Sequence, residues 1–235
     1  MLNLPDNRWQ AFSIHLAISA LIFLAALSVI HFIWYPGAFI QAGGWQGIKI
    51  VAAVDLVLGP ALTLLVYNKA KKSIKFDLAV IGLLQISCLT AGLIITEGQR
   101  PVLQVLVDDK IVLHSKSDLE FLEVDSETVE ALPGPSPKAL YVKLADTQEA
   151  SVAMIVNSLF THNKPVENRF ELFKPLTRAS HKEVQWRLQR AEQNIKENCF
   201  WMTIQSPHFA GDGCIQKQRG IVALRDSTSE INDTH

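Results

Sequence analysis

Long, almost uninterrupted apolar runs dominate the first part of the chain, and short apolar runs separated by polar residues make up the rest. The three long runs cover about residues 12–35, 48–67 and 77–96. A helix that crosses a hydrocarbon core of about 30 Å needs roughly 20 mostly apolar residues. Each run reaches that length, so the pattern predicts three transmembrane helices in an N-terminal domain of residues 1–98.

The first run has a second interpretation as a cleaved secretory signal peptide. Such a peptide has an apolar core of about 7–15 residues followed by a small-residue cleavage site. This run is longer, and it ends at Trp34-Tyr35-Pro36-Gly37, where an interfacial aromatic pair precedes a helix stop. These features favour a membrane-spanning helix.

The pattern changes after Arg100-Pro101 and predicts a soluble domain over residues 99–226, with a polar tail over 227–235. Apolar residues at 102–107 and 110–114, separated by Asp108-Asp109, predict a β-hairpin. Helical spacing predicts two helices, at 148–161 and 178–198. Further strands are expected at 139–144, 200–205 and 215–224. The expected fold class is therefore an α-helical membrane bundle of three transmembrane helices followed by a C-terminal α+β soluble domain.

The charge of the whole chain, -1, conceals a difference between these two parts. Residues 1–96 contain three acids and six bases, and the remainder contains twenty acids and sixteen bases. A basic, apolar anchor joined to an acidic, polar domain gives this distribution. A net-acidic domain also argues against nucleic-acid binding.

Lysines in one short loop predict the orientation in the membrane. The loop between the second and third runs has no acid and contains four lysines, whereas the loop at 36–47 has no charge. Basic residues in short loops stay on the cytoplasmic side. We therefore expect the lysine loop and the N-terminus in the cytoplasm and the C-terminal domain outside it, in the periplasm of a bacterial inner-membrane protein. The topology-setting residues are Lys69, Lys71, Lys72 and Lys75.

Two of the three cysteines lie in the soluble domain. Disulfides persist outside the cytoplasm, and a bond between Cys199 and Cys214 would close a loop of about 15 residues. Two unpaired thiols, or a zinc site that adds His208, are the alternatives, although the spacing matches no common zinc pattern. Cys88 lies inside the third run and is expected to be an inert thiol.

Asp55 is the most informative polar residue of the apolar part, because an acid near a bilayer centre costs about 2.5–3.5 kcal/mol on insertion scales. At about 1.5 Å per helical residue, the polar residues at comparable depth are Gln85, Ser87 and Thr90. Three interpretations remain open. Asp55 is protonated and bonds to the third helix to fix the bundle, it contacts a transmembrane helix of another protein, or it takes part in proton transfer or transport. The last is disfavoured because His15 and His31 lie near the ends of the spans.

Gly59-Pro60 follows Asp55 on the same helix. Proline removes one backbone hydrogen bond and clashes with the carbonyl of Leu56, so a local distortion is expected. Glycine lets neighbouring helices approach closely. The candidate residues for partner contact or bundle packing are Asp55, Gly59, Pro60, Gln85 and Thr90.

The sequence contains no motif that indicates catalysis. It has no glycine-rich phosphate loop, no G-x-S-x-G and no H-E-x-x-H. The acids between 118 and 130 are more typical of a solvated face than of a docking patch, and both interpretations remain open. We therefore expect no enzymatic activity, no cofactor and no metal.

Several segments together resemble the TfpX/TfpZ family of type IV pilin accessory proteins, to which FimB-like proteins are related. The similar segments, all within about the first 105 residues, are Arg8–Leu16, Trp34-Tyr35-Pro36, Asp55–Thr63 and Lys72–Leu78. The resemblance implies an inner-membrane protein that assists a cognate major pilin during pilus assembly, with the pilin, the assembly machinery and the lipid bilayer as partners.

Two other classes of function agree less well with the sequence. A membrane-anchored periplasmic sensor or transporter component should have a cytoplasmic output module, and the expected cytoplasmic segments are only the N-terminus and the lysine loop. A membrane-embedded enzyme would need a second catalytic group at the depth of Asp55, and no second acid is present there.

Overall fold

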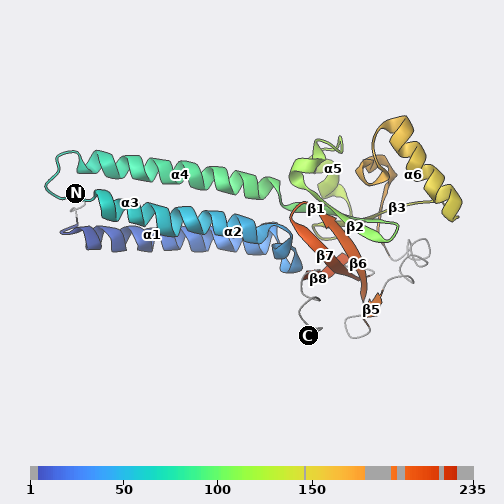
Figure 1. Cartoon of the computed structure of the whole chain (residues 1–235), viewed down its shortest axis with the longest axis horizontal. Helices are drawn as coiled ribbons and strands as arrows, with labels where there is room; N and C mark the ends of the chain where they lie inside the picture. The colour runs from blue at the N-terminus through green and yellow to red at the C-terminus, as the bar shows by residue number, and fades with distance from the viewer. Residues whose placement is uncertain (1–4, 146, 178–191, 195–198, 217–219, 227–235) are drawn as a thin grey trace, which may run out of the picture. The chain divides into compact units, whose positions relative to one another are not determined.

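The computed structural model describes residues 5–145, 147–177, 192–194, 199–216 and 220–226. The chain divides into two compact units (Figure 1). The first comprises Met1–Pro36 and Gly43–Gly98, and the second comprises Gly37–Ala42 and Gln99–His235.

The first unit is a bundle of long helices. Among the described residues, three helices are long and apolar enough to cross a membrane: Arg8–Trp34, Gly44–Val66 and Ile74–Gly98. The first consists of α1 (Arg8–Val29) and the π-helical η1 (Ile30–Trp34). The second consists of α2 (Gly44–Ala52), the π-helical η3 (Ala53–Leu58) and α3 (Gly59–Val66). The third is α4 (Ile74–Gly98). Each helix begins three or four residues before the corresponding predicted apolar run and ends within two residues of its end.

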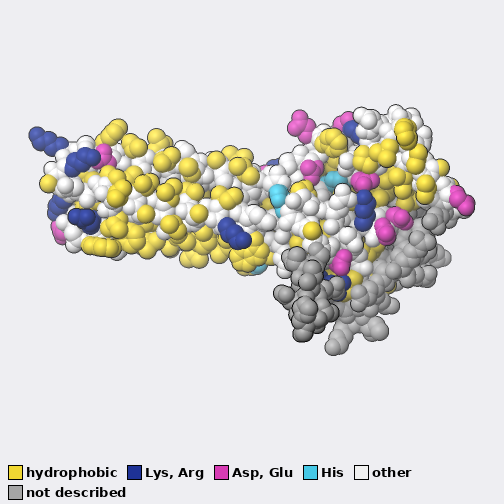
Figure 2. Space-filling view, viewed as in Figure 1, with side chains coloured by type: hydrophobic (Ala, Val, Ile, Leu, Met, Phe, Trp, Pro, Cys, Tyr) yellow, Lys and Arg dark blue, Asp and Glu magenta, His cyan; other side chains and the backbone are white. Residues whose placement is uncertain are grey.

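Burial in this bundle is the reverse of that in a soluble protein. Large apolar side chains such as Phe32, Leu65 and Leu83 are 73%, 81% and 68% exposed. The buried positions include the polar residues Ser19, Asp55, Thr63 and Thr96. Figure 2 shows hydrophobic side chains along the length of the bundle, with basic side chains gathered at one end. This distribution is consistent with a membrane protein, because lipid tails solvate apolar side chains and not polar ones.

The aromatic residues near the helix ends are of two kinds. The Tyr35 hydroxyl donates to the Thr96 carbonyl at 2.9 Å, and the Tyr67 hydroxyl donates to the Pro5 carbonyl at 2.6 Å. Both tyrosines are buried, whereas Trp9 and Trp45 are more than half exposed. The two tyrosines therefore tie segments of the bundle together.

The second unit contains one mixed sheet. Among the described residues its strand order is β4-β3-β1-β2-β6-β7-β8, and β5 also pairs with β6. The β1/β3 and β2/β6 pairs are parallel, and the other pairs are antiparallel. The strands are β1 (Pro101–Val107), β2 (Lys110–Ser115), β3 (Lys138–Val142), β4 (Phe173–Pro175), β5 (Glu192–Asn194), β6 (Cys199–Ser206), β7 (Phe209–Gln216) and β8 (Gly220–Asp226).

Helices and short turns complete this unit. They are η2 (Gly37–Ala42), η4 (Lys116–Leu119), α5 (Ser126–Ala131), α6 (Gln148–His162), η5 (Val166–Asn168) and η6 (Phe170–Leu172). The core packs β1 and β3 residues such as Leu103, Val105 and Leu140 against partly buried Met154 and Ile155 of α6. Two acids of the 118–130 segment have a local structural role, because Asp118 forms a capping box with Ser115 and Asp125 caps α5.

The structure confirms the predicted hairpin, the strand at 139–144, the helix at 148–161 and the strand at 200–205. It corrects two other expectations. The predicted strand at 215–224 is wrong as one element, because β7 ends at Gln216 and β8 begins at Gly220. The helix predicted at 178–198 is wrong over Glu192–Asn194, which pair with β6, and its other residues lie outside the described ones.

A disulfide joins Cys199 and Cys214, whose Cα atoms are 5.4 Å apart on the neighbouring strands β6 and β7. Both cysteines are fully buried. The bond confirms the predicted pair and removes the zinc alternative, because a disulfide sulfur is not a thiolate ligand. Cys88 is unpaired and half-buried.

Candidate functional site

Polar side chains from all three long helices meet inside the first unit. His15 and Ser19 come from α1, Asp55 and Thr63 from the second long helix, and Gln85 from α4. Ser19, Asp55 and Thr63 are each no more than 2% exposed. We call these five residues the polar network.

Gln85 connects the other members of the polar network. Its carboxamide oxygen lies 2.7 Å from His15 Nε2. Its carboxamide nitrogen donates to Ser19 Oγ at 3.0 Å and to Asp55 Oδ1 at 3.2 Å. The same nitrogen lies 3.4 Å from the Asp55 carbonyl oxygen. One side chain of α4 therefore holds both other long helices by hydrogen bonds.

His15 contacts Thr63 as well as Gln85, with Nδ1 2.5 Å from Thr63 Oγ1. Because the carboxamide oxygen of Gln85 only accepts, Nε2 carries a proton. Thr63 Oγ1 also lies 3.2 Å from the Gly59 carbonyl oxygen, to which its hydroxyl can donate. Thr63 therefore links His15 of α1 to the backbone of the second long helix.

Asp55 is 1% exposed, and its Oδ2 has no hydrogen-bond partner among the described residues. The Gln85 carboxamide stands between this carboxyl group and His15, so the acid and the base are linked through one side chain. A helix of another protein could reach Asp55 only if the bundle opened. This geometry favours the interpretation in which Asp55 fixes the packing of the three helices.

Local sequence explains why these side chains converge. His15 and Ser19 are four residues apart, as are Asp55 and Gly59, and a spacing of four places side chains on one helix face. Pro60 is buried in the first turn of α3, and the turn before it is π-helical, with the Gly59 N–H donating to the Val54 carbonyl. The distortion expected at Gly59-Pro60 is therefore a short segment of π-helix, and such segments are common at functional sites.

Gly59 makes room for the centre of the polar network. A Cβ atom at this position would lie 2.4 Å from Gln85 Oε1 and 2.9 Å from Gln85 Nε2. Gly47 has the same relation to Thr96, whose Cγ2 would lie 2.4 Å from an added Cβ. At both points a glycine on the second long helix faces a polar side chain of α4.

The structure brings some of the sequence-predicted candidates together and leaves others apart. Asp55, Gly59 and Gln85 are in contact, and Pro60 is buried beside them. Thr90 is exposed on α4, as is Ser87, so neither points into the polar network.

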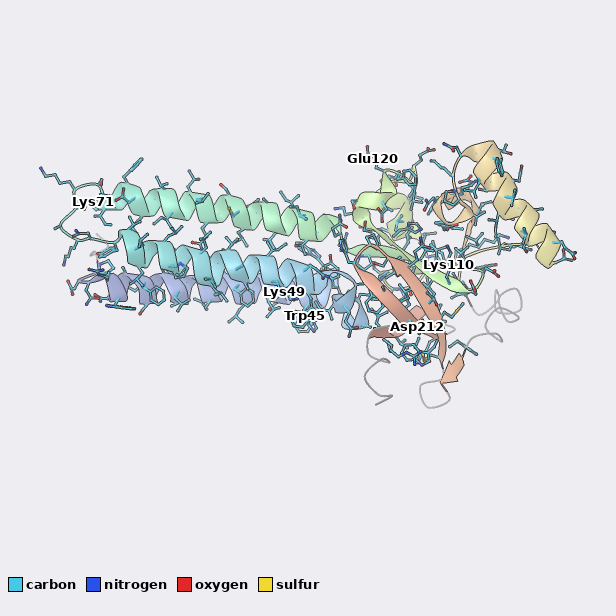
Figure 3. All side chains as sticks on the ribbon, in the orientation of Figure 1. Trp45, Lys49, Lys71, Lys110, Glu120 and Asp212 are labelled. Atoms are coloured by element: carbon cyan, nitrogen blue, oxygen red, sulfur yellow. A yellow bond between two sulfur atoms is a disulfide. The ribbon has the colours of Figure 1, made fainter. Side chains whose placement is uncertain are left out.

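The topology-setting lysines lie apart from the polar network, around the turn between α3 and α4. Lys69 pairs with Asp6 at 2.7 Å, and Lys71 pairs with Asp77. The hydrogen bond and charge of Lys69 hold the pKa of the Asp6 carboxyl below its ordinary value. In Figure 3, Lys71 and Lys49 lie toward opposite ends of the bundle. The N-terminal segment and the lysine loop therefore share one end.

Sequence reasoning missed three members of the polar network: His15, Ser19 and Thr63. His15 was set aside because it lies near one end of its span. The available signal was the spacing, since residues 15 and 19 share one helix face and residues 55, 59 and 63 share another. Depth along the helix axis was considered, but the direction of each side chain around the axis was not.

The polar network can hold helices together and keep a carboxyl group away from lipid. Interhelical hydrogen bonds of this kind are worth about 0.6 kcal/mol each on average in a membrane. Among the described residues, no group of three or more His, Cys, Asp or Glu side chains could hold a metal ion.

Comparison with known proteins relates part of the chain to fimbrial proteins. It is 30% identical over 109 residues to the fimbrial assembly protein of serogroup E1 of Dichelobacter nodosus, a match that covers 45% of this chain and 42% of that protein. It is 28% identical over 109 residues to the fimbrial assembly protein of serogroups C1 and C2 of the same organism, covering 45% of this chain and 83% of that protein.

The match thus spans less than half the length of the first relative. No family model and no solved structure matches the chain. The similarity supports a relation between 45% of this chain and the fimbrial assembly proteins of Dichelobacter nodosus.

Proposed function

We propose that this protein is a non-enzymatic accessory component of type IV pilus biogenesis. In this proposal it crosses the inner membrane three times and contacts a cognate major pilin both in the membrane and in the periplasm. The observation that carries the proposal is the similarity to two proteins named for fimbrial assembly. The TfpX/TfpZ and FimB-like resemblance of the N-terminal segments agrees with it.

The first unit supports a role within the bilayer. Its outer surface is apolar, and its polar side chains are bonded to one another across helices. A bundle whose polar network is turned inward presents a mainly apolar exterior, against which an apolar pilin helix could pack in the lipid. In this proposal Asp55 acts by keeping that surface in one shape and does not itself touch the pilin.

The second unit offers an apolar stripe for a periplasmic contact. One face of α6 packs on the domain through Ser151, Met154 and Ser158, and the Ser151 and Ser158 hydroxyls donate to the backbone at 2.9 and 2.7 Å. Another face is apolar and exposed, as the hydrophobic side chains over α6 in Figure 2 show. This exposed stripe consists of Val152, Val156, Leu159 and Phe160.

Residues at spacings of four, seven and eight lie along one face of a helix, which is the pattern by which helices dock on protein partners. Phe160 is 87% exposed and Val152 is 53% exposed. Water-facing apolar residues grouped in this way mark interaction surfaces more often than those that occur singly. In the proposal, the α6 stripe contacts the globular part of the pilin.

The proposal is tested in the native host with a deletion strain and tagged full-length protein. The deletion should remove or reduce surface pili, and the wild-type gene should restore them. The pilin should co-purify with the tagged protein after gentle extraction. Because a few apolar anchors carry most of the energy of an interface, Val156→Ser with Phe160→Ser should lower pilin recovery by about tenfold or more.

Thr161→Ser is the matched control, because it changes an exposed α6 position that points away from the stripe. It should retain both piliation and co-purification. Normal piliation in the deletion strain, together with no recovery of pilin, would rule the accessory role out.

A further inference from the structure

A pocket lies in the second unit where two parallel strands separate. β2 and β6 pair from Lys110 and Thr203 to Val112 and Gln205. Beyond that point the strands line a pocket with a volume of about 440 Å³, within the range of about 300–1,000 Å³ that is usual for ligand sites. The lining residues are Val112, Leu113, His114, Asp118, Phe121, Asn168, Gln205, Ser206 and Pro207.

The sequence explains why a gap opens here. Pro207 has no N–H to continue the pairing, and the chain turns there from β6 into β7. The pocket is therefore at the carboxyl ends of two neighbouring parallel strands, where ligands bind in many sheets.

His114 provides a buried, unused hydrogen-bonding atom in the pocket wall. It is 5% exposed, and its ring stacks on Phe173 with centroids 6.0 Å apart. Its Nε2 has no hydrogen-bond partner among the described residues, which is costly for a buried polar atom.

The other ring nitrogen fixes the tautomer. The imidazole ring forms a hydrogen bond with the backbone of Glu167, and this bond favours the charged form of the ring. Because Nε2 has no partner in the described part of the chain, Nδ1 is the nitrogen that donates this bond. Burial nevertheless lowers the pKa of His114, so the ring is neutral at pH 7. In a neutral ring with a proton on Nδ1, Nε2 is an acceptor. This acceptor is buried in the pocket wall and has no donor among the described residues.

The charge of the lining residues is negative. Asp118 is fixed in place by accepting hydrogen bonds from Ser115 N at 2.7 Å and Ser115 Oγ at 2.8 Å. Lys110, which lies near the pocket, is engaged with Glu167 and with Gln205, both at 2.8 Å. None of the nine lining residues is a lysine or arginine.

Phe121 adds an apolar wall suited to the stem of a ligand. Its ring is 56% exposed, and the Lys164 ammonium already lies 5.4 Å from the ring centroid. Aromatic rings attract cations through their negative faces. Val112, Leu113 and Pro207 supply further apolar surface, along which an aliphatic stem can lie.

We propose that this pocket binds an organic cation that carries N–H donors on an apolar stem, with His114 accepting one donor, Asp118 balancing the charge and Phe121 covering the stem. A free alkylamine or guanidine has this chemistry, and so has a lysine or arginine side chain of another protein. The proposal does not depend on the pilus role.

The test is calorimetric titration of the detergent-solubilised full-length protein. The probes are cadaverine, agmatine and N-acetyl-lysine methylamide, with 1,5-pentanediol as the uncharged match for cadaverine. We expect saturable binding of one cation per chain and no binding of the diol. Free amines that bind as tightly as the lysine derivative would identify a small-molecule site, and binding of the derivative alone would identify a side-chain site.

Variants assign the binding to the pocket. His114→Phe and Asp118→Asn should each weaken cation binding by about tenfold or more, since each removes a polar or charged contact to the ligand. Glu120→Gln is the matched control, because it removes an exposed carboxylate two residues from Asp118 that does not line the pocket (Figure 3).

Phe121→Ala gives an independent test that does not disturb a buried residue or a cap. It should weaken binding several-fold while leaving thermal unfolding unchanged. The proposal is overturned if none of the cations shows saturable binding, if the diol binds equally well, or if correctly folded His114 and Asp118 variants bind like the wild type.

Discussion

Gln85 is the centre of the polar network because its carboxamide both accepts and donates hydrogen bonds. Its oxygen accepts a hydrogen bond from His15 Nε2, and its nitrogen donates to Ser19 and Asp55. An aliphatic residue of the same size would leave two buried polar groups, Ser19 and Asp55, and the partly buried His15 without this partner. Buried polar groups without partners cost about 1–3 kcal/mol each, which is more than each hydrogen bond contributes. The position of this one side chain therefore determines the packing around it.

A test of this view uses two glycines in the long helices. Gly59→Ala would place a Cβ 2.4 Å from Gln85 Oε1, whereas Gly82→Ala meets no atom within 4 Å. Because Gln85 cannot move without breaking its hydrogen bonds, Gly59→Ala should destabilise the bundle by about 1–3 kcal/mol, the usual cost of overpacking. Gly82→Ala should be neutral or slightly stabilising. Unfolding in mixed micelles with increasing SDS measures both effects.

The double variant Gly59→Ala with Gln85→Ala separates the clash from other effects of the methyl group. If the clash with the carboxamide is the cause, adding Gly59→Ala to a Gln85→Ala background should cost much less than adding it to the wild type. Equal costs in the two backgrounds would show that the Gln85 carboxamide is not what Gly59 accommodates.

At single positions, the sequence indicated which residue is costly to bury in a membrane. It indicated less well which residues contact it. Asp55 stands out because one acid lies within a long apolar run, and Gln85 follows from helical rise. Thr90 has a suitable depth but is exposed on another face of α4. The facing direction depends on how three helices rotate about their axes, and that rotation is set by packing between the helices.

The second long helix shows what proline does within an apolar span. Pro60 cannot donate a backbone hydrogen bond, and the preceding residues 53–58 adopt π-helical pairing. A π-turn adds a residue to one turn and so changes the direction of the side chains that precede it. Sequence can predict a distortion at a proline, but the choice between a kink and a turn of π-helix depends on how the segment packs against the neighbouring helices.

The strands β6 and β7 depend on their disulfide as well as on pairing. Cross-linking residues 15 apart removes denatured-state freedom worth about 3 kcal/mol in the chain-entropy account. Replacing both Cys199 and Cys214 by alanine should therefore lower the unfolding free energy of the second unit by about 2–4 kcal/mol. Thermal melts followed by circular dichroism, with and without dithiothreitol, measure the loss.

Cys88→Ala provides the comparison, because this half-buried thiol is unpaired in α4. It should leave the melt unchanged, and reductant should still destabilise that variant. A double alanine variant that melts like the wild type would mean that strand pairing alone sets the stability of this region.

The elements of the second unit were predictable where short apolar runs were bounded by clear turn residues. The β1–β2 hairpin is an example, since Asp108 takes a positive φ of 51° in its acidic turn. Two parallel pairs, β1/β3 and β2/β6, could not be read from the sequence, because their partners are far apart along the chain. The pocket beside His114 depends on the β2/β6 pair, so it could not be predicted from the sequence either.

For the whole molecule, the strongest regularity is the contrast between the surfaces of the two units. Apolar residues are exposed along the helices of the first, and they form the core of the second. A single average hydropathy of +0.17 hides this contrast. The pattern of runs reveals it, so the division into a helical and a mixed part was predictable from sequence, whereas the polar network that links the helices was not.

The proposed topology gives the final prediction. Lys69, Lys71 and Lys72 lie between α3 and α4, and Lys75 lies in the first turn of α4. The Lys69–Asp6 ion pair keeps the N-terminal segment at the same end. Both segments should therefore lie on the side that retains basic loops, the cytoplasm. Alkaline phosphatase, which needs periplasmic disulfides, should be inactive when fused after Lys72 and active when fused after Gly98.

Green fluorescent protein fused at the same two junctions should give the opposite pattern. Changing the four lysines to glutamine should produce a mixed population, because Arg8 is then the main basic residue that anchors this end. Phosphatase activity after Lys72 and none after Gly98 would invert the orientation. The disulfide-bonded domain would then lie in a reducing compartment, where the Cys199–Cys214 bond would not persist. The fusion pattern and the redox state of the two cysteines must therefore agree, and either measurement alone can contradict the proposed topology.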